Sequence, residues 1–516
     1  MPYLDYNQSN GYLLPPYIEE LIPADHVARV VNRVVDLLGI RDLTSQEKVE
    51  GRPAYHPRMM LKILIYAYSQ KVCSSRVIAR RCGEDVVFMW LSGTQKPDFR
   101  TISDFRKNNI KVLKGLFKQV VQICQKLGMV TLGLVAIDGT KVKAAASDYG
   151  AKTKDALREA LKTVEADIER HMAEGLAIDK AEDAIYGEDR TGQELPKEVK
   201  QALEKRETIV AAIKEIQEIK ESDKTGKKEP KLNPLEKEAR FMKHSGGRIR
   251  LSYNCQAAVD EKEGVIVATG ITSEANDKRQ MLPMLEKVEE TVEKKPEKAV
   301  MDAGYCSKEN LEKAEKVETD CYVTSRKWEE EVQEKSSQEK EEMKVVVSSF
   351  ANPPLQKGVG VANEDRVIEA SETRQNMEPA DAVRRMRAKL QTEEGKEIYR
   401  QRKKIVEPVF GQVKFNLGFR RFRLRGVDKA DGEWTLVCLV HNIKKIYARI
   451  MVKGGELHDL TGELQAAYNS AWRSGFFIRM EGENLRLPSD LMVAKVRRSN
   501  SMSLKRPSFW TSSFMT

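Results

Sequence analysis

Apolar residues recur at helical spacing along the first quarter of the chain. Valines and leucines from His26 to Leu38 fall three and four positions apart, which gathers them on one face of a helix. Ser74 can cap a second helical segment, and a long amphipathic stretch runs from Thr101 to Leu127. The pattern predicts an all-helical domain over residues 1–130, and its arginines make it a candidate for DNA binding.

Strand-like patterns begin just after this region. The apolar run from Leu132 to Ile137 predicts a buried strand with Asp138 at its carboxyl end. Two further runs, RIRLSYNCQAAVD and GVIVATGIT, are joined by the turn-like residues 260–264 and predict an antiparallel hairpin.

Helix and strand patterns alternate again after the hairpin. Asn276 and Asp277 begin a predicted helix, and the short apolar segment KAVM leads into Asp302. A helix from Ser307 and a strand over DCYVTS follow. The carboxylate of Asp302 is therefore expected just beyond the end of a strand.

Two charged segments interrupt this series of predicted strands and helices, and a third segment follows its end. Residues 151–245 carry apolar residues at coiled-coil spacing on both sides of a polar break, GEDRTGQELP, and predict a helical hairpin or short coiled coil. Residues 329–392 are charge-rich and predict a second, partly disordered insertion. Residues 451–516 form a C-terminal extension with no assigned role.

The last strong pattern is a basic helix-like run from Glu397 to Phe419 with Glu407 at its centre. Helical spacing presents Tyr399, Lys403, Glu407 and Lys414 near one another. Eleven Lys and Arg residues stand against three acids between positions 396 and 429. Such a surface suits a polyanion, and the lone carboxylate is either a metal ligand beside a phosphate or a partner in surface ion pairs.

Composition agrees with a nucleic-acid partner. The 516-residue chain has a formal net charge of +10, which favours an anionic partner such as double-stranded DNA. Its seven cysteines stand singly and its six histidines form no zinc pattern. We find neither a basic-then-apolar leader nor an apolar run long enough to span a membrane, so the sequence predicts a cytoplasmic protein without membrane contact.

The order of the predicted elements matches an α/β fold, a ribonuclease-H-like core with a mixed five-stranded sheet. Residues 131–150, 246–328 and 393–450 would form this core. Asp138 and Asp302 would then end neighbouring strands, and a late helix can lay Glu407 across them. Three carboxylates suit a pair of hard divalent cations, although each aspartate is also compatible with an ordinary turn.

Several motifs resemble one protein family. LVAIDGTKVKA, YNCQAAVD, the ND of EANDKRQ, VMDAGY, YRQRKKIVEPVFGQVKFNLGFRRFRLRG and EWTLVCLVHNIKKI are similar to motifs of the DDE transposases of bacterial insertion sequences. The group numbered eleven-eighty-two is the most similar, and GRPAYHPRMMLKILIYAYS and PDFRTISDFR resemble the N-terminal transposase domain of that family. The resemblance spans residues 10–450.

The resemblance implies a set of site residues. Asp138, Asp302 and Glu407 match the catalytic, metal-binding acids of the family. Tyr399, Arg402 and Lys414 match the tyrosine, arginine and lysine of its tyrosine-arginine-glutamate-lysine signature, which contact DNA phosphates. Arg402 lies one position too far from the glutamate, and Lys403 occupies the expected slot, so either cation is a candidate.

The implied function is metal-dependent cleavage and strand transfer of DNA at the ends of a mobile element. The implied cofactor is a pair of Mg²⁺ ions, which Mn²⁺ can replace, and the implied partners are the element's terminal repeats, target DNA and further copies of the chain. Two alternatives stay open: a DNA-binding descendant that no longer cuts, and a ribonuclease-H-like nuclease without strand transfer.

Overall fold

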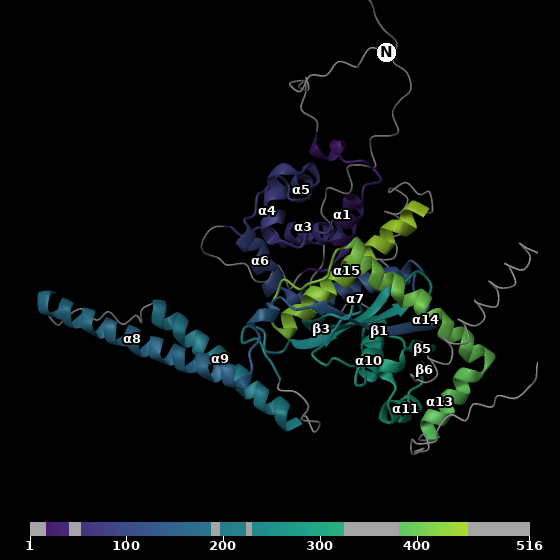
Figure 1. Cartoon of the computed structure of the whole chain (residues 1–516). Coiled ribbons are helices and arrows are strands. Elements are labelled where there is room, and N and C mark those ends of the chain that lie inside the picture. Colours follow the sequence, from purple (N-terminus) through teal and green to yellow (C-terminus); the bar gives the residue numbers. More distant parts are fainter. Residues whose placement is uncertain (1–16, 41–52, 187–196, 223–229, 325–380, 453–516) are drawn as a thin grey trace, which may run out of the picture. The chain divides into compact units, whose positions relative to one another are not determined.

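The computed structural model describes residues 17–40, 53–186, 197–222, 230–324 and 381–452 (Figure 1). The described residues form one compact unit.

A mixed β-sheet lies at the centre of the fold. Antiparallel β3 and parallel β5 flank β1, and the order across the sheet is β4-β3-β1-β5-β6. A sixth short strand, β2, pairs with the first residues of β3 beyond the part paired with β4. The strands are β1 Leu134–Lys143, β2 Arg240–Lys243, β3 Ile249–Asp260, β4 Ile266–Thr272, β5 Lys298–Met301 and β6 Asp320–Val323. The predicted α/β fold class and ribonuclease-H-like strand order are confirmed, with β2 as an additional strand.

The predicted hairpin is formed by β3 and β4. Gly264 provides the positive φ angle, +68°, that the turn between them requires. The buried carboxylate of Asp260 accepts hydrogen bonds from the backbone N–H groups of Thr131, Leu132 and Lys262. The hairpin is thereby tied to the residues that lead into β1.

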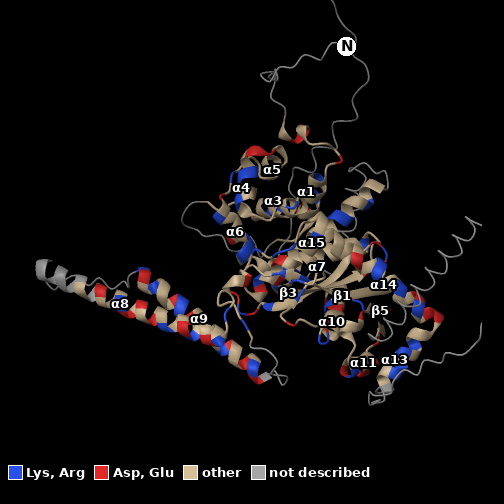
Figure 2. Ribbon diagram, viewed as in Figure 1, with Lys and Arg blue, Asp and Glu red and all other residues tan. Residues whose placement is uncertain are grey.

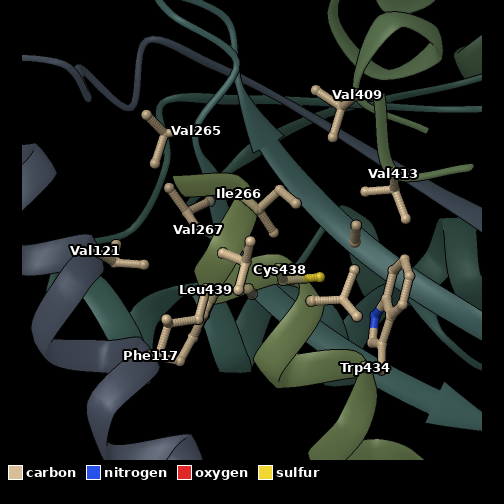
Figure 3. Packing of buried hydrophobic residues seen from close by; sticks show 14 of the residues in the cluster. Phe117, Val121, Val265, Ile266, Val267, Val409, Val413, Trp434, Cys438 and Leu439 are labelled. Carbon is tan, nitrogen blue, oxygen red and sulfur yellow. The ribbon is translucent and has the colours of Figure 1, made fainter. Parts of the chain in front are cut away.

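Helices cover both faces of the sheet. Helix α10 (Met281–Val292) packs on β3 and β4, and α14 (Glu393–Gly411) packs on β1, β3, β5 and β6. Helix α15 (Val427–Val452) lies against β4, and α7 (Ile110–Lys126) contacts both α15 and α10. Figure 3 shows the resulting core, in which apolar side chains of α7, the β4 hairpin, α14 and α15 interdigitate.

The N-terminal region is helical, as predicted, and shares its hydrophobic core with the sheet. Its helices are α1 Val27–Leu37, α3 Pro57–Ser69, α4 Ser75–Glu84, α5 Val86–Leu91 and α6 Phe99–Asn108, after a short 3₁₀ turn, η1 Ile18–Leu21. The predicted continuous helix from Thr101 to Leu127 is wrong, because Asn109 separates α6 from α7. Asp98 caps α6 by accepting the N–H groups of Arg100 and Thr101.

The first insertion forms two long helices, α8 (Lys154–Tyr186) and α9 (Lys197–Ser222), with a small apolar cluster of their own. Acidic and basic residues are interspersed along α9 and along the described part of α8 (Figure 2). The predicted polar break at 187–196 lies outside the described residues, as do 325–328 of the predicted core, 329–380 of the second insertion and 453–516 of the C-terminal extension. Helix α13 (Asp381–Gln391), at the end of the second insertion, packs on α11 (Lys308–Ala314) and β6.

Substitution by alanine is expected to have opposite effects on stability at two helical glycines. A Cβ atom on Gly432 of α15 would overlap the side chain of Ile110, so Gly432→Ala is expected to lower the free energy of unfolding by about 1–3 kcal/mol. Gly115 of α7 is exposed with open space around it, so Gly115→Ala is expected to raise that free energy by up to about 1 kcal/mol. Denaturant unfolding measures both, and a Gly432→Ala protein as stable as the unmodified one would contradict the close packing of α15 on α7.

Candidate active site

Asp138 lies within β1, and Asp302 directly follows the neighbouring strand β5. Ile137 pairs with Met301 in the parallel register of β1 and β5, so the two aspartates that follow are side by side. Asp302 stands just beyond β5, as predicted, and its Oδ1 accepts the N–H of Gly304 at 2.9 Å. Asp138 does not end its strand, contrary to prediction, because β1 continues along β3 to Lys143.

This arrangement concentrates negative charge in a buried place. Burial, and secondly the charge of Asp302, raise the pKa of Asp138 to about 7, while the guanidinium of Arg402 opposes the shift. Nη1 of Arg402 lies 3.1 Å from Oδ2 of Asp138. Two adjacent carboxylates repel each other unless a cation lies between them, and their oxygens are the ligands that hard divalent cations prefer. The donor chemistry of this pair therefore fits a divalent metal ion.

Arg402 reaches Asp138 because it lies on the inner face of α14. It is buried among apolar residues of the same face, and its Cζ lies 5.7 Å from the ring centroid of Tyr399. The inner face consists of Ile398, Tyr399, Arg402, Ile405, Val406 and Val409. Lys403 and Glu407 of the same helix are exposed. Of the four residues predicted near one another, Tyr399 is buried, Lys403 and Glu407 are exposed, and Lys414 lies beyond the end of the α-helix.

Lys414 belongs to a different local conformation. The predicted single helix over residues 397–419 changes at Gln412 into a π-helical turn that ends at Asn416. Burial lowers the pKa of Lys414 below its usual value, and the negative charge of Asp138 partly opposes this shift. Lys414 therefore lies within electrostatic range of Asp138.

Glu407 is not brought to the two aspartates. Within the described ranges, no three or more His, Cys, Asp or Glu side chains are grouped closely enough to hold a metal ion. The structure thus assembles Asp138, Asp302, Arg402 and Lys414, with Tyr399 behind Arg402, and leaves Lys403 and Glu407 at the surface of α14.

Four residues near the two aspartates were not predicted as site residues. Asp277 belongs to one of the motifs of the family resemblance but was predicted only to begin a helix and given no site role, and α10 begins four residues later. It instead accepts hydrogen bonds from Asn254 and Gln256 of β3, and Tyr305 bonds to Gln256. The signal in the sequence was the pair of amide residues two positions apart in this strand, which places both on one face of the sheet.

The basic segment after the π-helical turn is partly fixed to β1. Arg421 donates hydrogen bonds to the backbone oxygens of Ala144 and Ala145. Arg420 is exposed, with its Cζ 4.6 Å from the ring centroid of Phe415, which is itself 64% exposed.

In the described ranges, no helix has both the length and the apolar character needed to cross a membrane.

A ribonuclease-H-like sheet with paired carboxylates on adjacent strands defines a class of enzymes that act on phosphodiesters with divalent metal ions. Comparison with family models gives two matches. Residues 16–108, from η1 through α6, match the Transposase domain (DUF772). Residues 217–443, which include β2 to β6 and most of α15, match the Transposase DDE domain.

The chain therefore belongs to the insertion-sequence DDE transposases, and it is a DNA-cleaving and strand-transferring enzyme. The family implies a DNA substrate and dependence on a divalent metal ion. Neither the curated proteins nor the solved structures gave a significant match. Membership of the eleven-eighty-two group stays a prediction.

Proposed function

We propose that Asp138 and Asp302 are the first two metal ligands of this transposase and that Glu407 is the third. The observation that carries the proposal is the parallel register of β1 and β5, which sets the two aspartates side by side. Glu407 is on the helix that packs over these strands, but it is exposed there. We infer that it joins the aspartates when metal and DNA are bound.

The proposed cofactor is a pair of Mg²⁺ ions, for which Mn²⁺ can substitute. Such a pair supplies activation of the attacking oxygen and stabilisation of the leaving oxygen during phosphodiester cleavage and transfer. Arg402 holds the carboxylate of Asp138 in place. Lys414 and Lys403 bind DNA phosphates, and Tyr399 supports Arg402 through its ring.

The proposed substrates are the double-stranded ends of the mobile element and a target DNA, bound by more than one copy of the chain. We assign DNA binding also to residues 1–130. The catalytic core comprises residues 131–150, 246–328 and 393–450, to which β2 adds a strand from within the first insertion. Residues 151–245, 329–392 and 451–516 lie outside that core.

The test uses DNA that carries one element end, a target plasmid and Mg²⁺. We expect nicking at the element end and joined products, both abolished by removal of the metal. A pre-cleaved element end that lacks the 3′-hydroxyl should bind normally but yield no joined product. Binding without nicking would favour a descendant that no longer cuts, and nicking without joining would favour a nuclease.

The two lysines are expected to differ in effect. Lys414 is half-buried within range of Asp138, so Lys414→Ala removes a charge-assisted phosphate contact and should slow cleavage by about 10–100-fold at saturating DNA. Lys403 is exposed, so Lys403→Ala should mainly weaken binding and lower the salt dependence of affinity by about one unit of slope. Single-turnover cleavage and binding at several salt concentrations separate these effects, and equal cleavage rates would contradict the role of Lys414.

A further inference from the structure

A buried hydrogen-bond network lies beside the two aspartates. Oδ1 of Asp277 accepts the side-chain amides of Asn254 at 2.7 Å and Gln256 at 2.6 Å. Both amides come from β3, and both side chains are fully buried. A partly buried carboxylate that receives two amide donors is held in one orientation, because loss of either bond removes a hydrogen bond from a fully buried amide.

The network continues to the turn that carries Asp302. The hydroxyl of Tyr305 donates to Oε1 of Gln256, and the ring of Tyr305 is fully buried. Tyr305 ends the short turn η3 (Ala303–Tyr305), which Asp302 itself caps. Side-chain Nδ2 of Asn310 donates to the backbone oxygen of Tyr305, which ties α11 to the same place.

Two glycines show how closely this network approaches the candidate metal ligands. A Cβ atom on Gly304 would lie 2.9 Å from Oδ1 of Asp302 and 3.1 Å from Oδ2 of Asp277. A Cβ atom on Gly139, next to Asp138, would lie 2.8 Å from Oδ1 of Asn254. The network thus touches the backbone that follows each of the two aspartates.

We propose that Asp277 is a positioning residue that, through Gln256 and Tyr305, holds the turn of Asp302 beside Asp138. Asp277 is not itself a ligand in this proposal, because Oδ1 is taken by two amides and Oδ2 lies 3.7 Å from Nζ of Lys141. The inference rests on the proposed metal role of Asp138 and Asp302. Its consequence is that loss of one hydroxyl group, on Tyr305, weakens metal binding.

The experiment measures Mn²⁺ binding to the full chain by calorimetry and maps the site by Fe²⁺-dependent backbone cleavage. Tyr305→Phe keeps the ring and removes the link to Gln256, so we expect the Mn²⁺ dissociation constant to rise about 10-fold or more. Backbone cleavage near residue 302 should weaken in parallel. The control is Tyr322→Phe, which removes a hydroxyl from a buried tyrosine of β6 and should leave both readouts unchanged.

Substitution of Asp277 separates positioning from metal ligation. Asp277→Asn retains an oxygen that can accept both amides, so it should bind Mn²⁺ nearly as the unmodified protein does, whereas Asp277→Ala should weaken binding like Tyr305→Phe. Equal losses in the Asn and Ala variants would overturn the positioning role.

The unmodified protein tests the underlying metal role separately. If it shows no Fe²⁺-dependent cleavage near residues 138 and 302, the proposed function fails. If it shows that cleavage and Tyr305→Phe matches it in both readouts, only the present inference fails.

Discussion

Replacement of Asp302 by asparagine is expected to slow strand cleavage by at least about 10³-fold. The neutral amide binds a divalent cation poorly, and a bound cation stabilises the transition state by several kcal/mol. The asparagine oxygen can still accept the N–H of Gly304, so the turn should keep its conformation. DNA binding should persist, since the cationic side chains are unchanged. Cleavage of element-end DNA and a gel-shift assay measure the two properties.

Asp320→Asn is the matched control. Asp320 is an aspartate of the neighbouring strand β6 that pairs with Lys389 at the surface, so its loss should leave cleavage intact. Glu407→Gln should abolish cleavage as Asp302→Asn does if Glu407 is the third ligand. Full cleavage by the Asp302→Asn protein would rule out Asp302 as a metal ligand. Full cleavage by the Glu407→Gln protein alone would leave Asp138 and Asp302 as the only proposed ligands.

The largest effect on stability is expected at Glu433 of α15. Its side chain is fully buried, accepts the hydroxyl of Tyr68 at 2.7 Å and lies 3.9 Å from Nη1 of Arg106. It also accepts the backbone N–H groups of Arg423 and Leu424. Glu433→Ala leaves the buried guanidinium of Arg106 without its carboxylate and should lower the free energy of unfolding by about 3–5 kcal/mol.

Denaturant unfolding of Glu433→Ala and Asp428→Ala makes this prediction specific. Asp428 is an exposed acid in the first turn of the same helix, so its loss should change the free energy of unfolding little. A loss below about 1 kcal/mol for Glu433→Ala would mean that this ion pair behaves like one at the surface. The N-terminal helices would then not depend on α15 in the way that the contacts of Tyr68 and Arg106 indicate.

The strand framework could be predicted from sequence because it is encoded locally. Apolar runs bounded by turn residues mark β3, β4, β5 and β6, and the order of the elements is sufficient to place Asp302 beyond β5. The extension of β1 past Asp138 was missed, since its second half is the polar sequence GTKVK. That half is a strand because β3 pairs with it, which is a tertiary effect.

The orientation of α14 was missed for a different reason. Arg402 looks like a solvent-exposed cation when its neighbours in sequence are considered, yet apolar residues on either side of it turn the same face toward the sheet. Its buried charge is compensated by Asp138, which is 264 positions away. Similarly, the amide partners of Asp277 lie 21 and 23 positions before it, on β3. Side chains whose hydrogen-bond partners lie so far away in the sequence leave no local sequence pattern.

A crystal structure of the protein with Mn²⁺ tests the central claim most directly. We predict an anomalous peak between Asp138 and Asp302, within about 2.0–2.3 Å of an oxygen of each carboxylate. Mn²⁺ bound only elsewhere, or no peak at this pair at saturating Mn²⁺, would contradict the assignment of these two aspartates as the metal site.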